Sequence, residues 1–224
     1  MVSDKFSISE VRNTPVSNAV RLVLHVFVRL FFRVYLRMKS RGTSCLGGLR
    51  SSIIVANHVS HLDAFALFSS FSLGRVNLLR SLAAKDYFLR NRILRKLSFL
   101  FANIIPLKRG GVNAEAISYC GELLKKGYNL ILFPEGTRSA DGRINRFMTG
   151  VGLLSLKYNA PVIPAYIKGT YDSMKKGKLL PGRSRVEVVF GEKVDYTRLE
   201  NRRENWMFLA EELEGRIKSL AQAV

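Results

Sequence analysis

Short apolar runs of strand length alternate with longer amphipathic segments along residues 52–220. The strand-like runs are Ser52–Ala56, Ile104–Leu107, Leu130–Phe133, Val162–Ile167 and Val186–Phe190. Helical periodicity begins at about Asp63 and recurs in Tyr87–Phe101, Asn113–Lys126, Phe147–Tyr158 and Asn205–Leu220. Strands that alternate with helices predict an α/β fold, with a mostly parallel or mixed central sheet flanked by helices. In such folds the chemistry lies at the carboxyl ends of the strands.

The positive charge of the chain predicts an anionic partner. Its 224 residues carry a net charge of +19, and the stretch between Glu10 and Asp63 holds eight basic residues and no acid. Such a field attracts phospholipid headgroups or nucleic acid. The sequence contains no known nucleic-acid motif that interleaves aromatic with basic residues. We therefore expect an anionic membrane surface as partner, and no nucleic acid.

Residues Asn18–Lys39 contain no Gly or Pro and are predicted to form one amphipathic helix. Basic side chains four residues apart form a ridge along it: Arg21, His25, Arg29, Arg33 and Arg37. The other side is apolar and comprises Leu24, Phe27, Phe31, Val34, Tyr35 and Met38. The uncharged runs are far shorter than the ~18 residues that a spanning helix needs.

Two interpretations of this helix remain open. It either packs on the core with a solvated basic face, or lies in a membrane interface with its arginines at the phosphates. The bulky apolar residues and the absence of acids favour the interface. No linker or repeat divides the rest of the chain. We therefore expect an N-terminal membrane-associating helical segment over residues 1–44 and one catalytic domain over residues 45–224.

The segment Asn57–Asp63, with the sequence NHVSHLD, directly follows a predicted strand. An alcohol attacks a carbonyl only when a base is placed against its proton, and an imidazole suits this near neutral pH. A carboxylate on the other ring nitrogen fixes the tautomer. Asp63, at the start of a helix, can fold back on His58 for this purpose. On its own the pattern is weak, because His58 could be an ordinary loop histidine and Asp63 a helix cap.

Two neighbours compete for a role in this segment. His61 is the rival base, although two residues from Asp63 it is better placed to cap the helix or face solvent. Ser60 is the nearest candidate nucleophile. The two cysteines, Cys45 and Cys120, have no C-x-x-C spacing and no nearby histidine, so we expect free thiols and no metal site.

Three further segments hold residues suited to a phosphate or an acyl chain. In Phe133–Ser139, FPEGTRS, a proline ends a strand, Gly136 permits a turn, and Arg138 offers two parallel hydrogen bonds to a phosphate. In Ile105–Gly111, IPLKRGG, the cations Lys108 and Arg109 stand before two glycines. The last segment, Pro161–Gly169, is mainly a core strand.

Together, in this order and spacing, these segments resemble the four motifs of the glycerolipid acyltransferase family. The similarity to bacterial 1-acylglycerol-3-phosphate acyltransferases extends from about Ser51 to Asp195. It implies that His58 is the general base and Asp63 its orienting partner. It also implies that the acceptor and acyl chain are bound by Lys108, Arg109, Glu135, Gly136, Thr137, Arg138 and Pro164. The sequence departs from the family at Asn103, where the second motif usually begins with Gly, which leaves the acceptor headgroup open.

The resemblance implies direct acyl transfer to a lysophospholipid. The donor would be an acyl-CoA or acyl-carrier-protein thioester, with no cofactor bound permanently. The product from 1-acyl-sn-glycerol 3-phosphate would be phosphatidic acid. The expected location is peripheral or monotopic, on the cytoplasmic face of the inner membrane. Two alternatives remain: another acceptor, such as a different lysophospholipid, a lyso-ornithine lipid or glycerol 3-phosphate, and a non-enzymatic basic protein that binds membranes.

Overall fold

The computed structural model describes residues 15–84, 101, 105–107, 114–175, 177–178 and 180–224. Its strands are β1 (Lys39–Arg41), β2 (Ile53–Ala56), β3 (Leu79–Ala84), β4 (Ile105–Leu107), β5 (Asn129–Leu132), β6 (Val162–Lys168) and β7 (Glu187–Phe190). Its α-helices are α1 (Pro15–Val34), α2 (Asp63–Ser70), α4 (Ala114–Lys125), α5 (Gly150–Tyr158), α6 (Thr170–Ser173) and α7 (Arg203–Gln222). Two short 3-10 helices, η2 (Thr43–Leu46) and η3 (Leu73–Leu78), connect these elements.

The described strands form one seven-stranded sheet in the order β1-β7-β6-β2-β5-β3-β4. Every neighbouring pair is parallel except β6 and β7, which are antiparallel. The predicted α/β fold with a mixed central sheet flanked by helices is therefore confirmed. The central strand β2 lies between β5 and β6, so the carboxyl ends of these three parallel strands meet at one edge of the sheet.

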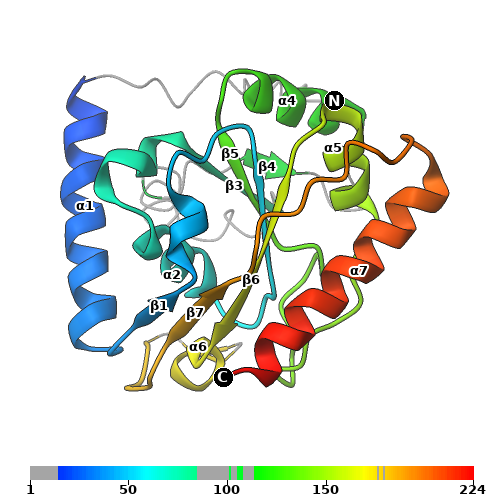
Figure 1. Cartoon of the computed structure of the whole chain (residues 1–224). Helices are drawn as coiled ribbons and strands as arrows, with labels where there is room; N and C mark the ends of the chain where they lie inside the picture. Colours follow the sequence, from blue (N-terminus) through cyan, green and yellow to red (C-terminus); the bar gives the residue numbers. More distant parts are fainter. Residues whose placement is uncertain (1–14, 85–100, 102–104, 108–113, 176, 179) are drawn as a thin grey trace, which may run out of the picture.

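Side chains of each strand alternate between two cores, one on each face of the sheet. In β2, Ile54 and Ala56 belong to the core under α1 and α2, whereas Ile53 and Val55 belong to the core under α4, α5 and α7. Figure 1 shows α1 and α2 on one side of the sheet and α7 on the other. No helix among the described residues is long and apolar enough to cross a membrane.

The predicted helix over Asn18–Lys39 is wrong at its carboxyl end. The helix α1 stops at Val34, Arg37 adopts a left-handed conformation with φ 45°, and Lys39 already belongs to β1. Leu36 O accepts from Val186 N at 3.1 Å, and Lys39 N donates to Val186 O at 3.0 Å. Pairing with β7 therefore draws this segment out of the helix, a long-range contact that local periodicity does not reveal.

The predicted division of α1 into a basic and an apolar side also needs correction. Arg21 and His25 are buried against the domain, whereas Phe27 and Val34 are 67% and 66% exposed. The other residues of the predicted apolar side, Leu24, Phe31, Tyr35 and Met38, pack on the core. The exposed stripe is itself apolar and comprises Val20, Leu22, Val23, Val26, Phe27, Leu30 and Val34. The boundary at residue 44 stays a prediction.

Most other elements lie close to where the sequence places them. Helix α4 ends before Gly127, which has the positive φ of a helix-terminating glycine. Helix α5 starts three residues later than predicted, at Gly150. Strands β1 and β3 were not predicted, and their sequences, KSR and LRSLAA, lack an apolar alternation. The predicted helix Tyr87–Phe101 lies outside the described residues except for Phe101, which is helical.

Candidate active site

His58 and Asp63 meet at the carboxyl end of β2. His58 Nδ1 lies 2.9 Å from Asp63 Oδ2, and Asp63 is the first residue of α2 and fully buried. The same Oδ2 accepts from the backbone N–H groups of Val59 and Ser60, both at 2.7 Å. Oδ1 accepts from the Thr170 hydroxyl at 2.6 Å. Three other donors therefore fix this buried carboxylate against Nδ1 of His58.

The ring of His58 is held in one orientation and reaches the surface. It stacks on Phe133 with ring centroids 4.3 Å apart and an interplanar angle of 23°. Its side chain is 23% exposed. Because a carboxylate only accepts, Nδ1 carries the hydrogen in this contact. Nε2 is then the unprotonated nitrogen of the neutral ring, available to accept a proton from a bound hydroxyl.

The backbone of His58 is held from both sides by the FPEGTRS segment. Glu135 Oε1 accepts from His58 N at 2.6 Å, and Ser139 N donates to His58 O at 2.8 Å. Glu135 Oε2 accepts from the backbone and side-chain nitrogens of Asn145, at 3.0 and 2.8 Å. Burial raises the pKa of Glu135, and the hydrogen bonds from His58 and Asn145 oppose that rise. Glu135 is thus engaged within the protein on both oxygens.

Arg138 and His61 form a second pair beside the first. Arg138 donates from Nη1 to His61 Nε2, so this nitrogen of His61 is an acceptor. Burial, together with the charge of Arg138, lowers the pKa of His61 to about 4. A nitrogen that already accepts from a guanidinium is a poor base for a substrate, which favours His58 over His61. Burial also lowers the pKa of Arg138.

The other predicted site residues are distributed differently. Gly136 has φ 68°, and a Cβ there would contact Met148, so the turn requires glycine; Gly136 and Thr137 are both exposed. Pro164 is buried within β6, in register with Val55. Its part in shaping an acyl site stays a prediction. Lys108, Arg109 and Asn103 lie outside the described residues.

Residues 38–168, which include both pairs, match the protein family described as Acyltransferase. The chain belongs to this family. A chloroplastic 1-acyl-sn-glycerol-3-phosphate acyltransferase of Brassica napus is 33% identical over 151 residues, covering 64% of this chain and 42% of that protein. One from Arabidopsis thaliana is 33% identical over 132 residues, covering 58% of this chain and 33% of that protein. The chain thus spans less than half the length of these relatives.

A solved structure also resembles this chain. PlsC from Thermotoga maritima, described as a 1-acyl-sn-glycerophosphate (LPA) acyltransferase, superposes with a TM-score of 0.70 at 26% sequence identity. The superposition covers 92% of this chain and 81% of that chain. The structural similarity therefore agrees with the family that the sequence match indicates.

The candidate nucleophiles of this chain are not activated. Ser60 is buried, and its hydroxyl donates to Met174 O at 2.8 Å. Burial raises the pKa of the Cys45 thiol, and it raises that of Cys120 to about 12. A thiol needs a lowered pKa to react as a thiolate. In the part of the chain that the structure describes, no three His, Cys, Asp or Glu residues are grouped to hold a metal ion.

Sequence reasoning missed three residues that hold the site together. The Thr170 hydroxyl donates to Asp63 from 107 positions away, and Asn145 donates two hydrogen bonds to Glu135 Oε2. Asn57 exchanges two hydrogen bonds with the backbone of Ile167, which ties the end of β2 to β6. Asn57 stands inside the NHVSHLD segment. No local pattern marks Thr170, whose partner Asp63 begins α2, or Asn145, whose partner Glu135 lies in the turn after β5.

Proposed function

We propose that this chain is a 1-acylglycerol-3-phosphate O-acyltransferase. It transfers a fatty acyl group from an acyl thioester to the free hydroxyl of 1-acyl-sn-glycerol 3-phosphate and produces phosphatidic acid. The observation that carries the proposal is the 2.9 Å contact between His58 Nδ1 and Asp63 Oδ2 beside Arg138. A base that faces outward next to a guanidinium suits an acceptor that carries both a hydroxyl and a phosphate. The names of the two plant relatives and of the Thermotoga structure support the same substrate.

In this mechanism His58 is the general base. Its Nε2 removes the proton from the acceptor hydroxyl as the oxygen attacks the thioester carbonyl. Asp63 stabilises the imidazolium that forms, which is favourable because this carboxylate is buried and fixed by other donors. The tetrahedral intermediate then expels the thiolate, and the imidazolium returns the proton to the sulfur. The protein ends in its starting state, with one ester formed and one thioester cleaved.

Direct transfer without an acyl-enzyme follows from the neighbouring side chains. A covalent route needs a nucleophile held against the base. The Ser60 hydroxyl is instead directed to Met174 O, and both thiols have raised pKa values. The acyl group therefore passes from sulfur to the acceptor oxygen in one exchange, from either an acyl-CoA or an acyl-carrier-protein thioester.

The acceptor phosphate is assigned to Arg138 and to the exposed turn at Gly136 and Thr137. Arg138 is half-buried, and its guanidinium can bind two phosphate oxygens at once. Lys108 and Arg109 are assigned to the same phosphate on the basis of the sequence motif. Glu135 supports this group indirectly, since both of its oxygens hold His58 and Asn145.

We place the protein on an anionic membrane through α1, as a peripheral or monotopic enzyme on the cytoplasmic face of the inner membrane. The outward face of α1 exposes Phe27, Leu30 and Val34 at 67%, 57% and 66%. A contiguous apolar stripe of this kind on a helix suits insertion to the depth of the headgroup boundary. The lipid acceptor and product would reach the site from the same surface.

An acceptor panel tests the proposal. Purified protein is incubated in anionic vesicles with a long-chain acyl-CoA while free thiol release is followed. The acceptors are lysophosphatidic acid, lysophosphatidylcholine, lysophosphatidylethanolamine, glycerol 3-phosphate and a lyso-ornithine lipid, and His58→Ala is the control. We expect turnover with lysophosphatidic acid that the substitution abolishes.

The other outcomes separate the alternatives. Turnover confined to another acceptor retains the chemistry of His58 and overturns the substrate. No turnover with any acceptor, repeated with an acyl-carrier-protein donor, overturns the enzymatic proposal and leaves a membrane-binding protein. Equal turnover by His58→Ala contradicts the assignment of the base.

A further inference from the structure

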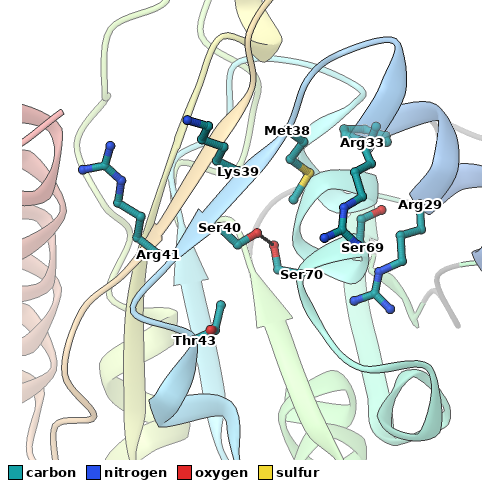
Figure 2. Close-up of a pocket in the computed structure, with 10 residues that line it drawn as sticks. Arg29, Arg33, Met38, Lys39, Ser40, Arg41, Thr43, Ser69 and Ser70 are labelled. Carbon is teal, nitrogen blue, oxygen red and sulfur yellow. Dashed lines mark hydrogen bonds between the residues drawn. The ribbon is translucent and has the colours of Figure 1, made fainter.

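A pocket of about 420 Å³ lies between the carboxyl-terminal half of α1, strand β1 and the end of α2. Arg29, Arg33, Ser40, Ser69 and Ser70 are among the residues that line it. Figure 2 shows the guanidinium groups of Arg29 and Arg33 on the side of the pocket where Ser69 lies, with the hydrogen-bonded Ser40 and Ser70 facing them. This part of the pocket thus combines two guanidiniums with three hydroxyls, and Lys39, Arg41 and Thr43 also line the pocket.

The polar groups of this pocket are only partly satisfied. The Ser69 hydroxyl is buried and has no hydrogen-bond partner within the described part of the chain. Arg29 donates from Nη2 to Phe71 O at 2.8 Å, which leaves its other N–H donors for a ligand. Arg33 is exposed and enters no ion pair among the described residues. Buried hydroxyls without a partner are uncommon and call for an explanation.

The charges of Arg29 and Arg33 in this pocket have no acidic partner among the described residues. Burial lowers the pKa of Arg29, and the neighbouring charge of Arg33 lowers it further. No residue lining the pocket is acidic. Glu187 lies nearby, but its carboxylate is taken by Arg41 Nε at 2.5 Å. Two guanidiniums one helical turn apart repel each other, and a bound anion would relieve that repulsion.

The pocket adjoins the exposed apolar face of α1. Arg29 and Arg33 stand one turn apart beside Leu30 and Val34, which are 57% and 66% exposed. A ligand with an anionic head and an apolar tail could therefore place the head in the pocket and the tail along α1.

We propose that this pocket binds the phosphate of an anionic membrane phospholipid that does not take part in the acyl-transfer reaction. The site is distinct from the His58 site, because its lining residues come from residues 29–43 and from the end of α2 and include none of the His58 cluster. A free phosphate or the phosphates of a nucleotide thioester share the same chemistry. The apolar stripe beside the arginines favours the lipid, since a soluble anion gains nothing from it. The proposal extends the membrane placement given above and does not depend on acyl transfer.

Vesicle binding tests the site without turnover. Sedimentation with vesicles of phosphatidylcholine alone, or with one fifth phosphatidylglycerol, measures the preference for the anionic lipid. Arg33→Gln removes one guanidinium, and Arg203→Gln removes an exposed arginine from α7 on the opposite face of the sheet. Ser40→Phe fills the pocket without changing the charge. His58→Ala is included because binding should survive the loss of catalysis.

We expect Arg33→Gln to reduce the preference about fivefold, the factor for one basic residue near an anionic surface. Ser40→Phe should reduce it similarly, whereas Arg203→Gln and His58→Ala should bind as wild type. Wild-type behaviour of Ser40→Phe would show diffuse attraction and overturn the site. An equal loss in Arg203→Gln would do the same. In a further outcome, inorganic phosphate stabilises the wild type against thermal unfolding but not Ser40→Phe, with no preference for anionic lipid in either protein. That outcome would overturn the lipid as ligand and assign a soluble phosphate to the pocket.

Discussion

The His58 cluster and the α1 pocket both gather polar side chains, but they differ in how these are paired. At His58, every oxygen of Asp63 and Glu135 has an internal donor. In the pocket, Arg33 has no ion pair among the described residues, and the Ser69 hydroxyl has no partner there. One region is complete before any ligand arrives, and the other has unused donors.

The difference follows from what each region has to do. A base acts only if its orientation is fixed before the substrate binds, and reorganisation at that moment would slow the reaction. A binding site for an abundant ligand can instead leave its donors to the ligand. Disturbing the first region should therefore lower the rate of catalysis, and disturbing the second should lower affinity for the surface.

The largest effect is expected from His58→Ala. Removing a general base costs about 10²–10⁴ in rate, so we expect kcat to fall by roughly a factor of 10³. Vesicle binding should be unchanged, because His58 lies outside the α1 pocket. Initial rates with lysophosphatidic acid and sedimentation of the same preparation measure the two effects. A parallel loss of binding would contradict the separation of the two regions.

Two histidines, His25 on the buried side of α1 and the half-buried His61 of the His58 cluster, should affect stability at acid pH. Burial lowers the pKa of His25, under α1, and of His61 to about 4, whereas an unfolded histidine titrates near ~6.5. The folded value is the lower one, so the unfolded state binds more protons between these limits. The free energy of unfolding should fall by the order of 2 kcal/mol per histidine as the pH drops from about 6.5 to 4.

Denaturant unfolding at a series of pH values measures this dependence. His25→Gln and His61→Gln should each have a shallower slope over that pH range than wild type. Gln at position 25 retains a donor for Phe101 O, which His25 Nε2 contacts at 3.0 Å. A slope that neither substitution changes would refute the assignment to these two side chains.

Glu135→Gln should slow catalysis without removing any group that touches the substrate. Gln offers one acceptor where Glu has two, so either His58 N or Asn145 loses its partner. A buried donor left unsatisfied costs about 1–3 kcal/mol. We expect kcat to fall about 30-fold, with the unfolding free energy reduced by about 2 kcal/mol. Glu204→Gln, at an exposed position in the first turn of α7, is the matched control.

The KM for the acceptor separates this positioning role from direct phosphate binding. A residue that holds His58 should leave KM nearly unchanged while kcat falls. A rise in KM with kcat unchanged would return Glu135 to the acceptor site, as the family resemblance implies.

The sequence predicted those parts of the fold that depend on local periodicity. Strand β2, helix α4 and helix α7 each carry an apolar pattern of the right period, and they appear within about two residues of their expected bounds. Strand β1 has the sequence KSR and exists only because β7 lies beside it. On α1, periodicity shows that two faces differ but not which one the core covers: Arg21 and His25 of the predicted basic ridge are buried, and Phe27 of the predicted apolar side is exposed.

The candidate site divides in the same way. His58 and Asp63 could be paired from sequence because they lie five positions apart in one loop. Thr170 could not, since it lies 107 positions from Asp63. Asn145 could not either, since no helix or strand periodicity links it to Glu135, ten positions before it. The partnership of Arg138 with His61 was likewise hidden, because the two residues are 77 positions apart.

The exposed apolar face of α1 can be tested independently of the arginine pocket. Phe27→Ser removes a side chain that is 67% exposed, and Phe208→Ser on α7 removes one that is 54% exposed on the other side of the sheet. Burying a Phe in an apolar phase contributes about 1.5–3 kcal/mol, so vesicle binding should weaken about tenfold in the first variant only. Binding to uncharged phosphatidylcholine vesicles measures this apolar contribution without the attraction between basic residues and anionic lipid. Equal loss in both variants would mean that α1 is not the membrane face.

The smallest effect is expected at His61, whose ring orients Arg138. His61→Leu removes the acceptor for Arg138 Nη1 and should raise the KM for lysophosphatidic acid about fivefold, since the guanidinium keeps its charge but loses one fixed contact of about 1 kcal/mol. The value of kcat should change little, because His58 keeps its contacts with Asp63 and Phe133. His61→Gln retains a side-chain acceptor and should recover part of the lost affinity. If His61→Leu instead abolished kcat while His58→Ala retained it, the base would be His61, and the cluster would have to be reassigned around Arg138.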